Sequence, residues 1–145
     1  MTKPALMFTY YIAAPLEDVW DGFVSKEANQ KIFMGADFEL DPRPGGRMVW
    51  SGPGKDGKPT RYATGEVVRF EPPRLLEYRF GLGAGETMSR VTIELTAESE
   101  AVKVVVTNSD FIEGDLSYAA NADGWPRILS RLKTLLETGK TFRPH

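Results

Sequence analysis

Three segments in the second half of the chain alternate apolar and polar residues and are separated only by short connections. Residues 75–80, 91–95 and 102–108 carry apolar side chains at every second position, with charged or polar neighbours between them. Successive side chains of a β-strand point to opposite faces, so this period of two predicts antiparallel strands with one apolar face. Such a face must be covered, which means that another part of the chain has to pack on it.

Segments earlier in the chain extend the same sheet. Residues 5–12 read as a first strand, and the alternation at residues 36–40 continues through a Pro-Gly turn into a strand that contains Met48 and Trp50. The strand at residues 62–70 is less regular than the others. We therefore predict a meander of six to seven antiparallel strands.

Two short helices are expected after the first strand. Pro15 is compatible with the first turn of a helix, and apolar residues at helical spacing follow it as far as Val24. Ser25 can cap a second short helix, whose apolar residues again share one face.

The segment after residue 115 supplies the cover for the sheet. Its apolar residues form one helical stripe, namely Trp125, Ile128, Leu129, Leu132, Leu135 and Leu136. We predict a helix that begins at Asp115 or Ser117 and ends near Thr138, with Gly139 as the left-handed terminating residue. The charged residues Arg127, Arg131, Lys133 and Glu137 are predicted to face away from the sheet.

Pro126 interrupts this helical pattern. It has no N–H for the carbonyl of Ala122, which predicts either a kink or a break at which Asp123 caps a new helix. We favour a kinked single helix, which would leave a cavity under its N-terminal half. The alternative is that Gly124 only lets the bend relax and Trp125 fills the core, with no cavity.

Composition excludes several classes of function. The 145 residues suit one domain, residues 1–145, and 18 basic against 20 acidic residues give a net charge of −2. No basic run is interleaved with aromatic residues, so nucleic acid is not an expected partner. The chain has no cysteine, no signal-peptide core and no apolar run long enough for a membrane span, which favours a soluble cytoplasmic protein.

Catalytic motifs are weak. His145 is the single histidine, which argues against a histidine-based triad, a His/Cys zinc site or an iron facial triad, so we expect no metal and no cofactor. The glycine-lysine stretch at residues 52–59 has phosphate-loop spacing but is better explained as a polar hairpin tip, and residues 81–86 as a turn. Glu66 would be the best acid–base candidate if it pointed inward beside Tyr62 and Tyr78; otherwise it lies on the solvent face or at a bulge, and we assign no catalytic residue.

A binding cavity suits the sequence better, because ligand pockets are mainly apolar and aromatic with a few polar groups. The two inward asparagines, which lack obvious partners, favour bound water or ligand atoms; ordinary core packing is the alternative for every candidate. The predicted ligand-binding residues are Phe38, Met48, Trp50, Tyr62, Glu66, Tyr78, Phe80, Asn108, Phe111, Tyr118, Asn121 and Trp125.

The order of elements, with four short motifs, resembles a known family. The motifs are A-A-P-L-E-D-V-W, P-G-G-R, G-E-V-V-R-F-E-P-P-R-L-L-E-Y and G-W-P-R-I-L-S-R-L-K-T-L-L-E-T-G. They resemble the bacterial proteins similar to the activator of the heat-shock-protein-90 ATPase, within the START-related (SRPBCC) superfamily. The resemblance implies an α+β helix-grip fold, in which a curved antiparallel sheet wraps around a long C-terminal helix and a hydrophobic cavity lies between them.

That superfamily includes lipid and hormone binders, polyketide cyclases and oxygenase domains, so the resemblance leaves three functions open. The first is a binding protein for a small apolar or amphipathic molecule, such as a lipid. The second is an interaction module for a chaperone or another protein, with a role in stress response. The third is a cyclase-like enzyme. The sequence leaves open whether the chain is a monomer or a homodimer.

Overall fold

A computed structural model describes residues 3–33, 35–83 and 88–143. In chain order its elements are β1 (Leu6–Ile12), α1 (Leu16–Val24), α2 (Lys26–Ile32), β2 (Asp37–Leu40), β3 (Arg47–Pro53), β4 (Pro59–Glu71), β5 (Leu75–Leu82), β6 (Ser89–Ala97), β7 (Val102–Ser109) and α3 (Ser117–Thr138). The strands form one seven-stranded sheet in the order β1-β7-β6-β5-β4-β3-β2, and every neighbouring pair is antiparallel.

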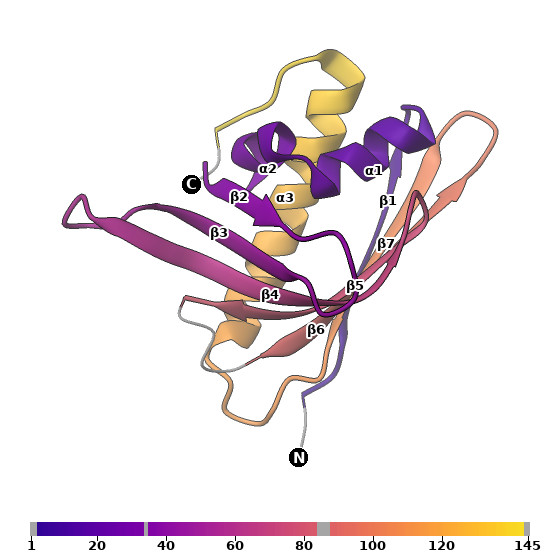
Figure 1. Ribbon diagram of the computed structural model, residues 1–145. Helices are drawn as coiled ribbons and strands as arrows, with labels where there is room; N and C mark the ends of the chain where they lie inside the picture. The colour runs from indigo at the N-terminus through magenta and orange to yellow at the C-terminus, as the bar shows by residue number, and fades with distance from the viewer. Residues whose placement is uncertain (1–2, 34, 84–87, 144–145) are drawn as a thin grey trace.

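The sheet curves around α3, which lies across its concave face, while α1 and α2 lie beside one end of α3 (Figure 1). This arrangement confirms the predicted α+β helix-grip fold, including the two short helices after the first strand. Ser25 caps α2 as predicted, since its Oγ accepts a hydrogen bond of 3.1 Å from the Ala28 N–H. Gly139 ends α3 in the left-handed region, with φ 84°.

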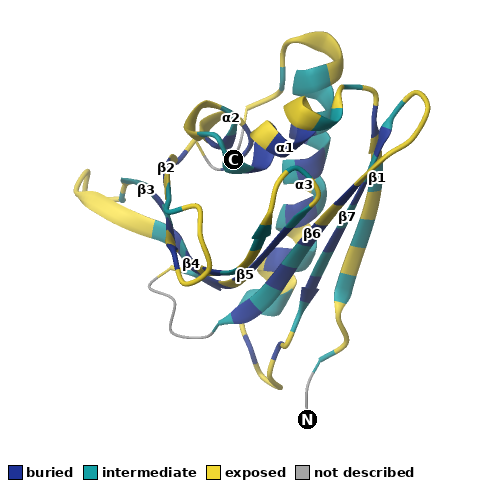
Figure 2. Ribbon diagram, turned by 45° about the vertical axis from the view of Figure 1, so that its right-hand side comes forward, coloured by how far each residue is buried: buried dark blue, intermediate teal, exposed yellow. Residues whose placement is uncertain are grey.

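The core lies between the sheet and the helices. On β6 and β7 the buried residues alternate with more exposed ones. On β5 the residues Leu76, Tyr78 and Phe80 are buried on the α3 side, and Glu77 is buried on the other face as well. Figure 2 shows the buried parts of β6, β7 and α3 in dark blue. The alternation on β6 and β7 confirms the period of two in the sequence. Burial of these apolar side chains, at roughly 25 cal/mol for each Å² removed from water, is the main force that holds α3 on the sheet.

The irregular strand β4 contains a β-bulge. The register shifts between Val67 and Arg69, so that Val68 has no opposite residue on β5. Before the bulge, Ala63 and Val67 are buried, whereas Glu66 is exposed. Because the bulge changes the parity of the strand, Glu66 points outward although Phe70 packs against the core, so of the two alternatives for Glu66 the structure shows the solvent face.

α3 runs without a break from Ser117 to Thr138, with Pro126 inside it. The alternative of two helices with Asp123 as a cap is therefore wrong. Asp123 instead forms an ion pair of 3.0 Å with Arg127, one turn further along the helix. The carbonyl of Pro126 accepts a hydrogen bond of 3.3 Å from the Tyr10 hydroxyl, which ties α3 to β1.

A charged network lies on the sheet face that points away from α3. Glu77 is only 6% exposed, and its carboxylate accepts hydrogen bonds from Arg90 and from Arg69, the latter at 2.6 Å. Burial raises the pKa of Glu77, but the hydrogen bonds from Arg90 and Arg69 outweigh burial and leave the pKa below its usual value. Arg90 also pairs with Asp110 at 3.0 Å.

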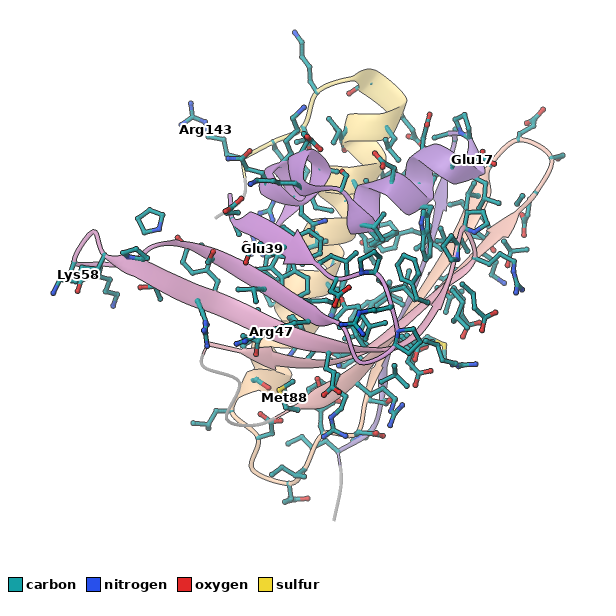
Figure 3. All side chains as sticks on the ribbon, in the orientation of Figure 1. Glu17, Glu39, Arg47, Lys58, Met88 and Arg143 are labelled. Carbon is teal, nitrogen blue, oxygen red and sulfur yellow. The ribbon has the colours of Figure 1, made fainter. Side chains whose placement is uncertain are left out.

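The glycine-lysine stretch forms the turn between β3 and β4, with Lys58 near its projecting tip (Figure 3). The predicted turn at residues 81–86 lies partly outside the described residues, and His145 lies entirely outside them. Across the described ranges, no helix has both the length and the hydropathy that a membrane span requires. The same ranges contain no cluster of three or more candidate metal ligands.

Candidate ligand-binding site

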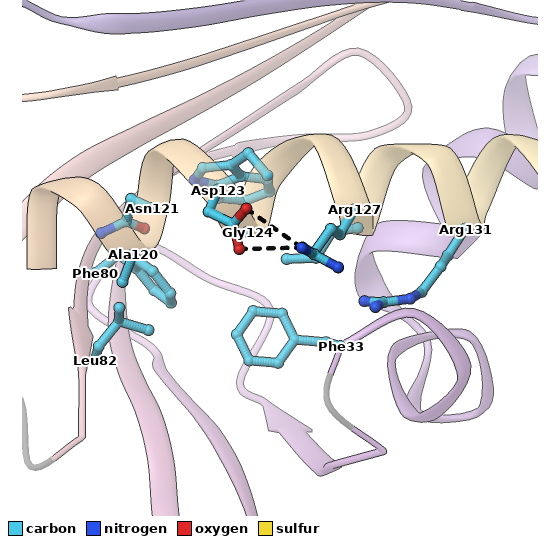
Figure 4. A pocket seen from close by; sticks show the side chains of 11 residues that line it. Phe33, Phe80, Leu82, Ala120, Asn121, Asp123, Gly124, Arg127 and Arg131 are labelled. Atoms are coloured by element: carbon cyan, nitrogen blue, oxygen red, sulfur yellow. Dashed lines mark hydrogen bonds and ion pairs between the residues drawn. The ribbon is translucent and has the colours of Figure 1, made fainter. Parts of the chain in front are cut away.

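A pocket with a volume of about 220 Å³ opens between α3, the end of β5 and the residue that follows α2. We call it the α3 pocket; Figure 4 shows it from close by. Its lining residues are Phe33, Phe80, Leu82, Ala120, Asn121, Asp123, Gly124, Trp125, Arg127, Ile128 and Arg131. Most of the lining residues belong to α3, and the first of them lie in the N-terminal half of this helix, under which the sequence predicts a cavity.

Helical spacing explains which α3 residues reach the pocket. Ala120, Gly124, Arg127 and Arg131 lie three or four positions apart, so they share one face of the helix. Gly124 contributes empty space to this face, because a Cβ atom there would meet nothing within 4 Å.

Three aromatic side chains form one side of the pocket, and we call Phe33, Phe80 and Trp125 the aromatic wall. The ring centroids of Phe33 and Phe80 are 6.3 Å apart, as are those of Phe80 and Trp125. Trp50 supports this wall from behind, stacked on Phe33 at 5.0 Å and edge-on to Phe80 at 5.5 Å. Packing on several sides leaves the wall little freedom to move.

Several predicted site residues belong to the core behind this wall. Phe38, Met48, Trp50 and Tyr78 are each at most 3% exposed and do not line the pocket. Burial raises the pKa of the Tyr78 phenol above its usual value, so this side chain stays neutral at physiological pH. These residues shape the site through the wall that they support.

Asn108 was expected to mark bound water or ligand, but protein groups satisfy its amide. Its Oδ1 accepts a hydrogen bond of 3.1 Å from Trp125 Nε1. Its Nδ2 donates to Ser89 Oγ at 2.9 Å and to the Arg90 carbonyl at 3.0 Å. Asn108 therefore fixes the orientation of Trp125 instead of facing the pocket.

Asn29, which the sequence analysis did not single out, has the corresponding role for Trp50. Its Oδ1 accepts a hydrogen bond of 3.0 Å from Trp50 Nε1, and its Nδ2 donates to the carbonyls of Phe23 and Ser25. Asn29 and Asn108 thus each hold an indole ring in place.

The other predicted residues are dispersed. Glu66 is exposed on the outer face, and half-buried Tyr62 donates a hydrogen bond of 2.8 Å to the Pro53 carbonyl. Phe111 and Tyr118 pack edge-on at 4.8 Å, and the Tyr118 hydroxyl donates to the Pro4 carbonyl at 3.0 Å. Of the predicted set, Phe80, Asn121 and Trp125 line the α3 pocket, and Asn121 donates from Nδ2 to the Ser117 carbonyl at 3.0 Å.

Two arginines of α3 give the pocket its charge. Arg127 is exposed and paired with Asp123, whereas Arg131 is only 4% exposed and donates from Nη1 to the Ile32 carbonyl at 3.3 Å. Burial, and then the charge of Arg127, lowers the pKa of Arg131. The sequence predicts that Arg131 faces away from the sheet, but this residue is buried all the same, because α2 covers this side of α3.

Comparisons with known proteins agree with this fold. The family model described as activator of Hsp90 ATPase homolog 1-like protein matches residues 13–137. No curated protein matches the sequence significantly. A solution structure from Cytophaga hutchinsonii is 28% identical with a TM-score of 0.77, covering 96% of this chain and 97% of the other.

Two further structures share the fold. DynU16, a protein in the dynemicin biosynthetic locus, is 24% identical with a TM-score of 0.79; the alignment covers 98% of this chain but only 50% of DynU16. CalU16 from Micromonospora echinospora is 22% identical with a TM-score of 0.72, and the alignment covers 96% of this chain and 83% of CalU16.

Proposed function

We propose that this chain, which belongs to the activator of Hsp90 ATPase homolog 1-like family, is a binding protein that holds a small apolar or amphipathic molecule in the α3 pocket. The observation that carries the proposal is an apolar cavity of about 220 Å³, one side of which is the aromatic wall. Core residues hold this wall in place from behind. The members of this fold share no single activity, so the proposal rests on the site and not on the family.

The volume limits the size of the ligand. An engineered apolar cavity of roughly 150 Å³ accommodates benzene, and drug-sized ligands occupy roughly 300–1,000 Å³. At about 220 Å³ the α3 pocket suits one or two fused rings or a chain of similar volume. The fold neighbour DynU16 belongs to a biosynthetic locus, which is compatible with a small-molecule role for this fold.

A titration with 2-naphthamide, a neutral two-ring probe, tests the proposal. We expect one site per chain, with a Kd of roughly 10 μM to 1 mM for a ligand of this size. Gly124→Leu places a branched side chain in the empty part of the pocket and should weaken binding at least tenfold. Ala119→Leu is the matched control, because Ala119 is exposed on α3 and does not line the pocket.

Calorimetry measures both the affinity and the stoichiometry. Absence of saturable binding, or equal affinity in wild type and Gly124→Leu, would contradict the proposal.

The two alternative functions depend on other features. A role in protein interaction would use the connection between β7 and α3, where Leu116 is 95% and Ile112 55% exposed. A cyclase-like activity would need a catalytic group in the pocket, but Asp123, the carboxylate that lines it, is paired with Arg127. The exposed position of Glu66 removes the acid–base candidate that the sequence offered.

A further inference from the structure

Arg131 is the most unusual residue of the α3 pocket. Arginine is almost never fully buried unless it is paired, yet only 4% of Arg131 is exposed. In Figure 4 the guanidinium groups of Arg127 and Arg131 both point toward the space beside Phe33. The two cations and the aromatic wall thus line the same pocket.

The hydrogen-bonding capacity of Arg131 is largely unused. A guanidinium has five N–H donors, and Arg131 donates from Nη1 to the Ile32 carbonyl at 3.3 Å. Its Nε is buried without a hydrogen-bond partner. The ring of Phe142 covers one face of the guanidinium, 5.2 Å from its central carbon. A planar acceptor in the pocket would satisfy donors that residues 3–33, 35–83 and 88–143 leave unpaired.

The charges around the pocket do not balance. The charged lining residues are Asp123, Arg127 and Arg131, which carry one negative and two positive charges, a net charge of +1. Asp123 pairs with Arg127. No salt bridge to Arg131 occurs within residues 3–33, 35–83 and 88–143. Arg131 is therefore a buried cation whose counter-charge is missing from the part of the chain that the structure describes.

We propose that the ligand of the α3 pocket is a small carboxylic acid, whose carboxylate binds Arg131 while its ring or chain packs on the aromatic wall. This inference rests on the proposed function and specifies the chemical class of the ligand. Carboxylate fits this site because its two oxygens match the planar guanidinium fork, and charge-assisted hydrogen bonds of this kind are about twice as strong as neutral ones.

The test compares two probes of nearly the same shape, 2-naphthoate and the neutral 2-naphthamide. Calorimetry on the wild-type protein at pH 7 should give a Kd for naphthoate at least tenfold below that for naphthamide. Arg131→Met keeps an unbranched stem as far as the position of Nε but removes the charge and the fork, and should make the two affinities equal within about threefold. Arg43→Met also removes one arginine, at an exposed position outside the pocket, and should leave the wild-type preference unchanged.

The outcomes separate this inference from the proposed function. Binding of naphthamide without preference for naphthoate in the wild type would overturn the carboxylate proposal and leave the pocket proposal standing. Failure of both probes to bind would overturn both. If Arg131→Met does not fold, Arg131→Lys replaces it: the lysine keeps the charge without the fork, so part of the preference should remain, and an undiminished preference would contradict the role of the fork.

Discussion

Two glycines in helices should respond in opposite ways to the same substitution. Replacing an interior helical glycine by alanine gains about 1 kcal/mol in helix propensity. At Gly124 the added methyl meets nothing within 4 Å, so Gly124→Ala should raise the free energy of unfolding by about that amount. For a chain of 145 residues this corresponds to a Tm increase of roughly 2–4 °C.

Gly22 in α1 lies against α3 instead. A Cβ there would be 2.4 Å from Leu132 Cδ1 and 3.2 Å from Leu132 Cδ2, and Leu132 is 0% exposed. Overpacking of a dense core costs about 1–3 kcal/mol, which offsets or exceeds the propensity gain of Gly22→Ala. Because that gain is common to both variants, Gly22→Ala should be less stable than Gly124→Ala by about 1–3 kcal/mol.

Urea denaturation followed by tryptophan fluorescence measures this difference, provided that the m-values agree. The double variant Gly22→Ala with Leu132→Ala serves as the control, because a shortened side chain at position 132 removes the clash. Its destabilisation should be smaller than the sum of the two single changes. Equal stability of Gly22→Ala and Gly124→Ala would refute the packing argument.

Three further predictions concern the sheet, the tryptophan anchor and Pro126. The pKa of Glu77 in the folded protein lies below its usual value of 4.5, so the ionised group stabilises the fold above pH 4.5, and this contribution is lost as the pH falls through the folded pKa. Glu77→Gln should therefore lower the free energy of unfolding by about 1–3 kcal/mol at pH 7 and by less at pH 3. Urea denaturation at both pH values measures the difference. Asn108→Ala leaves Trp125 Nε1 without its acceptor and Ser89 Oγ without one of its two partners, and should lower the free energy of unfolding by about 2–4 kcal/mol. A loss below about 0.5 kcal/mol would show that the anchor is dispensable. Pro126→Ala restores a donor for the Ala122 carbonyl and should leave the Tm unchanged or raise it. If the proline shapes the pocket, the same variant should bind naphthamide more weakly than the wild type does. Unchanged affinity would contradict that role.

The sequence predicts the fold well because each element has its own period. Strands with one buried face, such as β6 and β7, alternate regularly, and the apolar stripe of α3 extends over its whole C-terminal half, so type and order follow from the local pattern. The bulge at Val68 is only partly visible in the sequence: the alternation at residues 62–70 is irregular, but the pattern does not show which residue is the extra one.

The site is less accessible to sequence reasoning, because it depends on contacts between distant residues. A helical pattern shows the face that packs on the sheet, but it does not show that α2 covers a second side of α3 and buries Arg131. Similarly, the inward position of Asn108 follows from strand parity, whereas its partners Ser89 and Trp125 come from another strand and a helix. Phe33, directly after α2, has no local feature that marks it as part of the aromatic wall.

The position of β1 in the sheet has a consequence for the order in which the protein is made. Strands from β2 to β7 each pair with a neighbour in the chain, but β1 pairs with β7, and its nearest registered partners, Ile12 and Val102, are 90 residues apart. At synthesis rates of roughly 5–20 residues per second, this separation takes about 5–18 s to translate. A nascent chain can therefore assemble its hairpins while β1, made first, still has both edges unpaired. The earliest strand to leave the ribosome is among the last that can join the sheet.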